Sequence, residues 1–381
     1  MQSSGVMDDS PVQSQTLERA CELPGAVISF ACGTAQEAMR GPGLILTREQ
    51  LIDLKRYETH GLALPTVLRD VVWYLGYERG AGLNLEARDF QETFNLVHDH
   101  ALRWNPIRTS LMNVGSELWV FADQMQVYET AVQALYDHIK SKPEIAPADA
   151  DDFLHYLQQV AVLVMQHRGS TEALKSTLDD FALHLSSVVM PAVQLKLRSI
   201  ANIDTSPQTR RLNGTINSRA DHVMQQQREY RTQVENATDA TSPQIGLNIY
   251  KSAEAHRTRQ QLKQLRVAQL QEIFQLAQQN TIHASLQRLR NDLQDVTLVI
   301  LDAGIAINNM VTVWNGLHTY LTASIQEANK IDSSLTLRRL MNAFRLVAEP
   351  WRQIKRDADT LLKVFKEADR DFRRDHGFPW T

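Results

Sequence analysis

A regular repeat of apolar residues between positions 282 and 321 constrains the fold of this chain more than any other feature. Apolar side chains recur there at steps that alternate between four and three residues. This spacing aligns them in one stripe along a helix and is typical of a coiled-coil seam. The predicted seam contains Ile282, Leu286, Leu289, Leu293, Val296 and Ile300, and continues through Ala303, Ile307, Met310, Trp314, Leu317 and Leu321.

The helix that carries this seam is expected to be very long. Apolar residues of 262–276 continue the stripe with a change of phase, which we interpret as a stutter within one helix. No proline occurs from Gln244 to Ile331, and a helix of about 80 residues would extend about 120 Å. Such a helix needs a partner along its length, for which residues 170–239 are the candidate. The two are expected to pair antiparallel around a hairpin tip near 240–250.

The sequence therefore predicts an all-α fold in which a helical globular part carries a long antiparallel coiled-coil stalk. Thr47 and Gln50 show the capping-box pattern that opens a helix in the globular part. The predicted organisation is a loose N-terminus at 1–16, a globular part at 17–169 plus 300–375, a stalk at 170–299 and a loose C-terminus at 376–381.

Composition and charge exclude several classes of function. The 16 glycines and 12 prolines in 381 residues suit long helices. A net charge of −4 gives no basic surface for nucleic acid, so no nucleic-acid partner is expected. The first residues lack the basic and apolar segments of a signal peptide, and no run approaches the roughly 18 apolar residues of a membrane-spanning helix. We expect a soluble protein, released without a recognisable signal peptide, that meets a membrane only after a conformational change or with a partner.

No residue pattern indicates catalysis, a metal or a cofactor. The metalloprotease, nucleophile-elbow and phosphate-loop motifs are missing. His98 and His100 form the tightest histidine pair, but helix positions two apart point about 200° away from each other and cannot share one ion. Cys21 and Cys32 are expected to be buried or idle thiols, and whether they pair stays open. We expect no enzyme, although a site that converges from distant positions stays an alternative.

Residues around the predicted tip are candidates for contact with lipid. The apolar ones are Ile245, Leu247, Ile249 and Tyr250, and the basic ones that follow are Lys251, Arg257 and Arg259. The basic residues fit two interpretations, a solvated helix face or contacts to lipid headgroups.

Several segments resemble the A component of the alpha-xenorhabdolysin binary cytotoxins, and together they cover most of the chain. They lie at Glu22–Pro24, Gly43–Thr47, Leu51–Lys55, Gly61–Thr66, Tyr74–Tyr77, His98–Trp104, Asp302–Ile307 and Leu337–Trp351.

This resemblance implies a five-helix-type globular tail domain, a two-helix stalk and a hydrophobic head at the end of the stalk. It also implies a function without catalysis, in which A and B components pair and assemble a ring that perforates target-cell membranes. His98, His100 and Trp104 would then be packing residues of the tail.

The tip departs from the family, whose head is a strongly apolar hairpin. Burying the four apolar tip side chains would contribute about 6–10 kcal/mol, which supports attachment to a membrane surface but not passage through a hydrocarbon core of about 30 Å. Two hypotheses follow. The chain is an A component whose B partner supplies the spanning helices, or it is a non-lytic coiled-coil scaffold or binding module of the same architecture.

Overall fold

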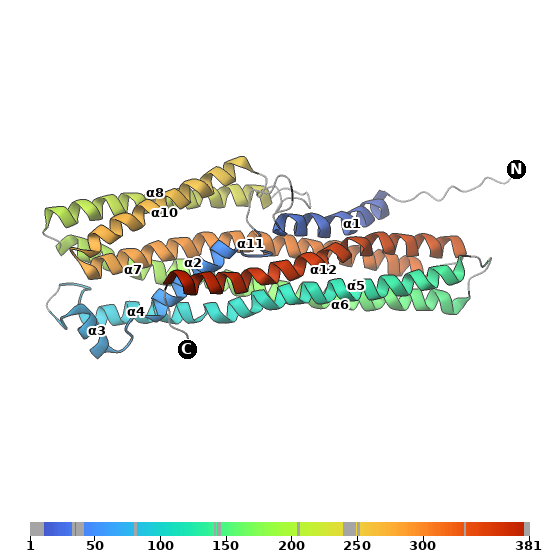
Figure 1. Ribbon diagram of the computed structural model, residues 1–381, viewed down its shortest axis with the longest axis horizontal. Helices are drawn as coiled ribbons and strands as arrows, with labels where there is room; N and C mark the ends of the chain where they lie inside the picture. Colours follow the sequence, from blue (N-terminus) through green and yellow to red (C-terminus); the bar gives the residue numbers. More distant parts are fainter. Residues whose placement is uncertain are drawn as a thin grey trace. The chain divides into compact units, whose positions relative to one another are not determined.

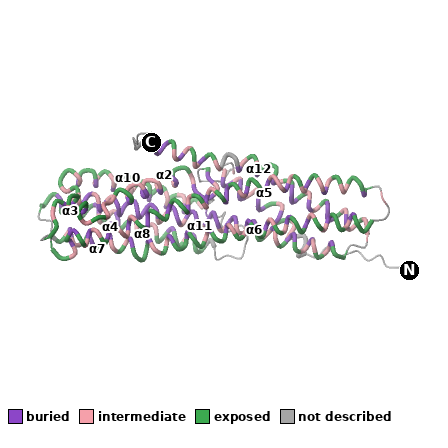
Figure 2. Tube along the Cα trace, turned by 90° about the horizontal axis from the view of Figure 1, so that it is seen from below, coloured by how far each residue is buried: buried purple, intermediate pink, exposed green. Residues whose placement is uncertain are grey.

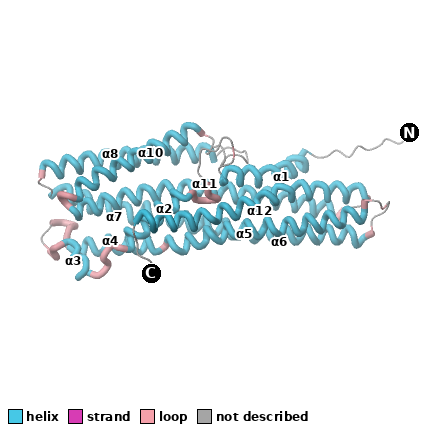
Figure 3. Tube along the Cα trace, in the orientation of Figure 1, coloured by secondary structure: helices cyan, strands magenta, loops and turns pink. Residues whose placement is uncertain are grey.

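The computed structural model describes residues 11–32, 35, 42–79, 82–140, 142, 146–203, 206–238, 249, 252–330 and 333–376. These residues are helical apart from short turns, and no strand occurs among them (Figure 3). The prediction of an all-α fold is confirmed. The helices are α1 (Pro11–Cys32), α2 (Arg48–Leu62), α3 (Leu68–Leu75), α4 (Ala87–Leu102), α5 (Trp104–Ile139), α6 (Pro147–His184), the π-helical turn η1 (Leu185–Val189), α7 (Met190–Ile203), α8 (Pro207–Thr238), α10 (Ala253–Ala277), α11 (Thr281–Ala328) and α12 (Ser334–His376) (Figure 1).

The chain divides into two compact units. The first consists of Met1–Leu44, Met112–Ala173 and Ile307–Lys363, and the second of Ile45–Leu111, Leu174–Ala306 and Val364–Thr381. The domain boundaries given above from the sequence stay a prediction.

An aromatic cluster forms the core of the first unit. Trp314 stacks on Trp351 with 6.0 Å between ring centroids, and Phe121 packs edge-on against both indoles. The Trp314 indole N–H donates to Thr171 Oγ1 at 3.0 Å, which satisfies this buried polar group.

Helices α2 and α4 of the second unit approach each other closely. A Cβ atom at Gly61 would lie 2.7 Å from Ala101 Cβ, so only glycine permits this close approach. Next to Ala101, the buried His100 side chain bridges α2 and α6. Its Nε2 lies 3.1 Å from the Phe181 carbonyl oxygen, which can only accept, so Nδ1 accepts the Tyr57 hydroxyl at 2.5 Å. His100 and Trp104 are thus packing residues, as the resemblance implied.

Helices α8 and α10 form an antiparallel hairpin, as predicted for the segments on either side of the tip. Tyr230 contacts Arg259, 29 residues away, whereas Arg219 contacts Glu272, 53 residues away. A separation that widens away from the tip is the mark of antiparallel pairing. We call this hairpin the arm.

The prediction of one uninterrupted helix through residue 277 and beyond is wrong. Between α10 and α11 the chain turns at residues 278–280, where the Asn280 side chain accepts the His283 N–H at 2.9 Å and caps α11. The change of phase that was interpreted as a stutter marks this turn.

The turn folds the arm back along α11. Asn213 contacts His283, Gln294 contacts the Ala220 carbonyl oxygen, and Tyr230 contacts Asp302, at separations of 70, 74 and 72 residues. A nearly constant separation means that α8 and α11 run parallel. Figure 1 shows α8 and α10 beside α7 and α11.

Helix α11 is buried on more than its apolar stripe. Of the predicted seam residues named first, Leu286, Leu289, Leu293, Val296 and Ile300 are buried and Ile282 is half-buried. Polar residues between them are buried as well. In Figure 2 much of the tube around the α11 label is coloured as buried. By length and composition α11 could cross a membrane. The search for an uninterrupted apolar run in the sequence did not indicate this. Because 61% of its most apolar 18-residue window is buried in the protein, α11 is equally accounted for as a core helix.

Candidate functional site

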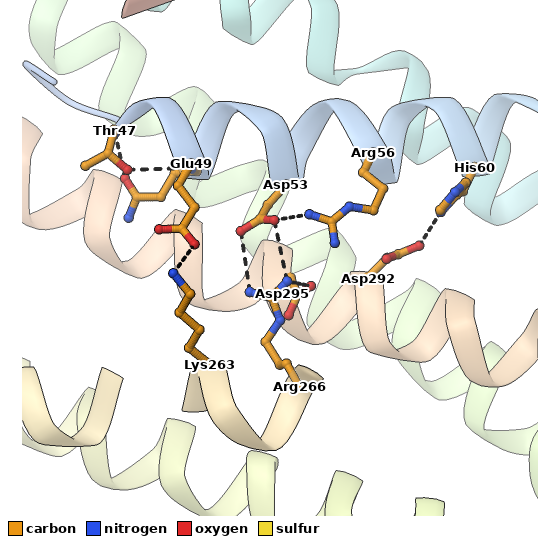
Figure 4. A network of polar contacts seen from close by, with 10 residues as sticks. Thr47, Glu49, Asp53, Arg56, His60, Lys263, Arg266, Asp292 and Asp295 are labelled. Carbon is orange, nitrogen blue, oxygen red and sulfur yellow. Dashed lines mark hydrogen bonds and ion pairs between the residues drawn. The ribbon is translucent and has the colours of Figure 1, made fainter. Parts of the chain in front are cut away.

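The arm contacts α2 and α11 through a network of polar side chains (Figure 4). We call the surface of α2 and α11 that the arm contacts the seat; it includes Glu49, Asp53, Asp295 and Asp302. Helix α2 opens with the predicted capping box, in which the Thr47 N–H donates to Gln50 Oε1 at 2.8 Å. This bond orients the Gln50 amide, whose Nε2 donates to Asp302 Oδ2 at 2.8 Å. The capping residues therefore also fix α2 against α11.

Arg266 of α10 lies at the centre of the seat. Its guanidinium contacts Asp295 of α11 and lies 3.4 Å from Asp53 Oδ2 of α2, so one arm residue joins both supporting helices. Asp53 is also paired with Arg56 of its own helix. The side chains of Arg266, Asp53 and Asp295 are 16%, 10% and 2% exposed.

Burial and charge act against each other in this cluster. Burial lowers the pKa of Arg266, but Asp295 and Asp53 outweigh it and raise that pKa above its usual value. Burial raises the pKa of Asp295 well above the usual value, and the nearby Asp53 and Asp292 add to this, while Arg266 opposes it. Arg266 therefore stays charged, and its guanidinium opposes the rise in the pKa of Asp295.

Exposed and half-buried contacts flank this core. Lys263 Nζ of α10 lies 2.6 Å from Glu49 Oε1 of α2, with 56% and 64% of the two side chains exposed. At the other end of α2, His60 Nδ1 lies 2.5 Å from Asp292 Oδ2 of α11. The ion pair of Lys263 is therefore exposed, whereas that of Arg266 is buried.

A second cluster joins the arm to the same helices near the tip. The Tyr230 hydroxyl of α8 donates to Asp302 Oδ1, and Arg259 Nε of α10 donates to the Tyr230 hydroxyl at 2.8 Å. Arg259 also lies 3.7 Å from Asp302 as an ion pair. Burial and the Asp302 charge raise the pKa of Tyr230, so the phenol stays a hydrogen-bond donor.

Polar contacts recur between the two clusters of the seat. Gln227 donates to the Gln294 carbonyl oxygen at 2.5 Å, and Gln294 donates to the Ala220 carbonyl oxygen at 2.9 Å. A compact apolar cluster lies near the turn and contains Ile216, Ile273, Leu276 and Ala284. Further apolar residues of the arm, Val223, Val234 and Leu262, are buried as well, so the arm combines specific polar contacts with apolar burial.

The structure locates only some of the predicted membrane-contacting residues. Ile245, Leu247, Tyr250 and Lys251 lie outside the described residues, and Ile249 is 2% exposed. Arg257 is exposed, whereas Arg259 lies in the Asp302 cluster.

Sequence reasoning missed the seat itself. Asp292 and Asp295 fall between seam positions, where a charged side chain is usually solvated. The available signal was two carboxylates placed between the seam positions Leu289, Leu293 and Val296 of α11. Among the residues that the structure describes, no group of three or more histidine, cysteine or acidic side chains could hold a metal ion.

Comparison with known proteins identifies the fold. No family model matches the sequence, and no curated protein matches it. Among solved structures, soluble SmhA of the tripartite alpha-pore forming toxin Smh from Serratia marcescens is 12% identical, covers 92% of this chain and 96% of SmhA, and has a TM-score of 0.56. YaxA from Yersinia enterocolitica is 21% identical, covers 87% of this chain and 100% of YaxA, and has a TM-score of 0.50.

The chain has the fold of SmhA and YaxA. Nearly the whole of each of these two proteins is matched, so the shared fold includes the long helices. XaxA from Xenorhabdus nematophila also matches, with 20% identity over 87% of this chain and 99% of XaxA and a TM-score of 0.49.

Proposed function

We propose that this chain is a component of a multi-part α-helical pore-forming toxin. Within that class we propose that it is the A component, which pairs with a B component to assemble a membrane-perforating ring. The observation that carries the proposal is the arm, a helical hairpin folded back onto a polar seat within the fold of SmhA. SmhA is itself a component of a tripartite pore-forming toxin, and the arrangement suits a protein released in latent form.

In the proposed mechanism the arm leaves its seat at the target membrane. Residues Gln278–Asn280 contain neither glycine nor proline, so α10 and α11 can join into one continuous helix once the turn opens. The tip residues Ile245, Leu247, Ile249 and Tyr250 would then contact the membrane. Lys251, Arg257 and Arg259 would meet lipid headgroups, and Arg259 becomes available for this only after it leaves Asp302.

The B partner supplies the membrane-spanning helices in this proposal. The tip has too few apolar side chains to cross the hydrocarbon core, but attachment of each subunit adds up when many assemble in one ring. A partner with an apolar hairpin therefore complements an arm whose tip is polar.

The test is release of dye from liposomes by the purified chain, alone and with a candidate B partner, a smaller helical protein with an apolar hairpin encoded beside it. The proposal predicts release only when both proteins are present. Absence of release with any such partner would contradict it and favour the second candidate, a non-lytic scaffold or binding module of the same architecture, which the polar tip supports.

A further inference from the structure

A cavity of about 310 Å³ lies between α7, α8 and α11, and none of the contacts described above uses its charged groups. Its polar lining residues are Gln194, Arg198, Asn202, Asn217, Asp221 and Arg290. At roughly 30 Å³ for each molecule of liquid water, the cavity has room for a small ion together with several waters.

Arg290 is the buried group of this cavity. Only 8% of the residue is exposed. Its Nη2 donates to the Ile216 carbonyl oxygen at 3.4 Å, and its Nε has no hydrogen-bond partner among the described residues. Burial lowers the pKa of Arg290 to about 10, which Asp221 opposes. A buried guanidinium with so little compensation calls for an anionic partner.

The rest of the lining supplies further donors. Arg198 of α7 is an exposed second guanidinium at the cavity. Asn217 Oδ1 accepts the Gln287 amide at 3.3 Å, which leaves the N–H groups of Asn217 available as donors. With two arginines and, among the described lining residues, one carboxylate at Asp221, the formal charge of the lining is about +1.

We propose that this cavity binds a small oxyanion of the phosphate type, held by Arg290 and Arg198 with support from the Asn217 amide. Guanidinium groups bind tetrahedral oxyanions through paired, charge-assisted hydrogen bonds. The bound phosphate group can be a free ion or the terminal phosphate of a lipid headgroup. Because the lining comes from α7 and α8, the anion would tie the arm to the helix that precedes it. The site itself does not depend on the proposed toxin function.

Isothermal titration of the full chain with inorganic phosphate, against sodium chloride at matched ionic strength, tests the site. We expect saturable binding that Arg198→Gln weakens at least tenfold. The matched control is Arg228→Gln, which removes the same charge from an exposed position of α8 outside the cavity and should leave the affinity unchanged. Arg290→Lys, which keeps the charge but loses the guanidinium geometry, should also weaken binding.

Two results would overturn the proposal. A heat of phosphate addition that chloride reproduces would mean that the cavity holds water only. Equal weakening by Arg198→Gln and Arg228→Gln would mean diffuse attraction to the surface. Circular dichroism of each variant shows whether it is folded. If Arg290→Lys does not fold, the affinity of Arg198→Gln for phosphate still tests the proposal.

Vesicles distinguish the two sources of the phosphate group. If it belongs to a lipid, vesicles of phosphatidylcholine with phosphatidic acid should bind the chain more strongly than phosphatidylcholine alone, and both free phosphate and Arg198→Gln should reduce that preference. Saturable binding of free phosphate without a vesicle preference assigns the site to the free ion.

Discussion

Arg266 of α10 and Asp295 of α11 form an ion pair whose side chains are only 16% and 2% exposed, and this pair links the arm to its seat. Lys263, one turn earlier on α10, makes the same type of contact with Glu49, but there both side chains are more than half exposed. Both pairs join α10 to the seat, so the exposed pair of Lys263 can serve as a control for the buried pair of Arg266.

Replacing Arg266 should loosen the arm far more than replacing Lys263. Arg266→Met leaves Asp295 buried without this cation and leaves Asp53 with Arg56 alone, and breaking a buried pair in this way costs about 3–5 kcal/mol. Lys263→Met removes an exposed pair worth at most about 1 kcal/mol. Urea denaturation measures the change in the free energy of unfolding, and equal effects of the two variants would contradict the buried seat.

The turn at Asn280 gives a second prediction. Asn280→Ala removes the cap of α11, which costs about 1 kcal/mol, and alanine also favours a continuous helix. Hydrogen exchange of the arm amides should therefore become about fivefold faster, as expected for a 1 kcal/mol change in an opening equilibrium. Gln278→Ala is the control, because it also introduces alanine into the turn, at an exposed position, without removing the cap. An unchanged exchange rate in Asn280→Ala would argue against a hinge here.

How much of this arrangement the sequence predicts depends on the kind of interaction. The all-α fold, the capping box at Thr47 and the antiparallel pairing of α8 with α10 follow from local patterns. The fold-back does not, because a change of phase between Leu276 and Ile282 is produced equally by a stutter and by a turn. Residues 278–280 contain no glycine or proline, and the one local signal for the turn is Asn280, a residue type that favours helix N-caps.

The polar seat escapes prediction for a related reason. Arg266 can be paired with Asp295 and Asp53 only after the direction of α10 relative to α11 is known. Until then Arg266 resembles any charge on a solvated helix face. Arg259 shows the same effect, since its partner Asp302 lies on a helix that the turn brings alongside.

Buried His100 should make stability depend on pH. Burial lowers its pKa to about 4, below the usual value of about 6.5. A group with a lowered pKa stabilises the fold fully above its unfolded pKa, and this contribution is lost as the pH falls from about 6.5 towards 4. The loss amounts to about 3 kcal/mol at 1.36 kcal/mol per pKa unit.

Comparison with His100→Gln isolates this contribution. The variant should be less stable than the natural chain at pH 7, and the difference should shrink as the pH is lowered to 4. Urea denaturation at several pH values measures both. A difference that stays constant would contradict the neutral, buried state of His100.

The tip can be tested directly even though Ile245 and Leu247 lie outside the described residues. Changing both to aspartate should weaken binding of the chain to vesicles at least tenfold, because two charged groups would replace apolar ones at the membrane surface. Val267→Asp is the control, since Val267 is an apolar residue of α10 that is already 52% exposed. Unchanged binding of the double variant would exclude the tip as the contact.

The most direct test of the account is to fasten the arm to its seat. Glu49→Cys and Lys263→Cys, made with Cys21→Ser and Cys32→Ser, place two thiols where the natural side chains touch, and a short, reductively cleavable bis-maleimide can join them. Dye release from liposomes is then measured with the partner that makes the uncross-linked protein active. We predict no release while the arm is fastened and full release after the cross-link is cleaved. Full release by the cross-linked protein would contradict the claim that the arm must leave its seat.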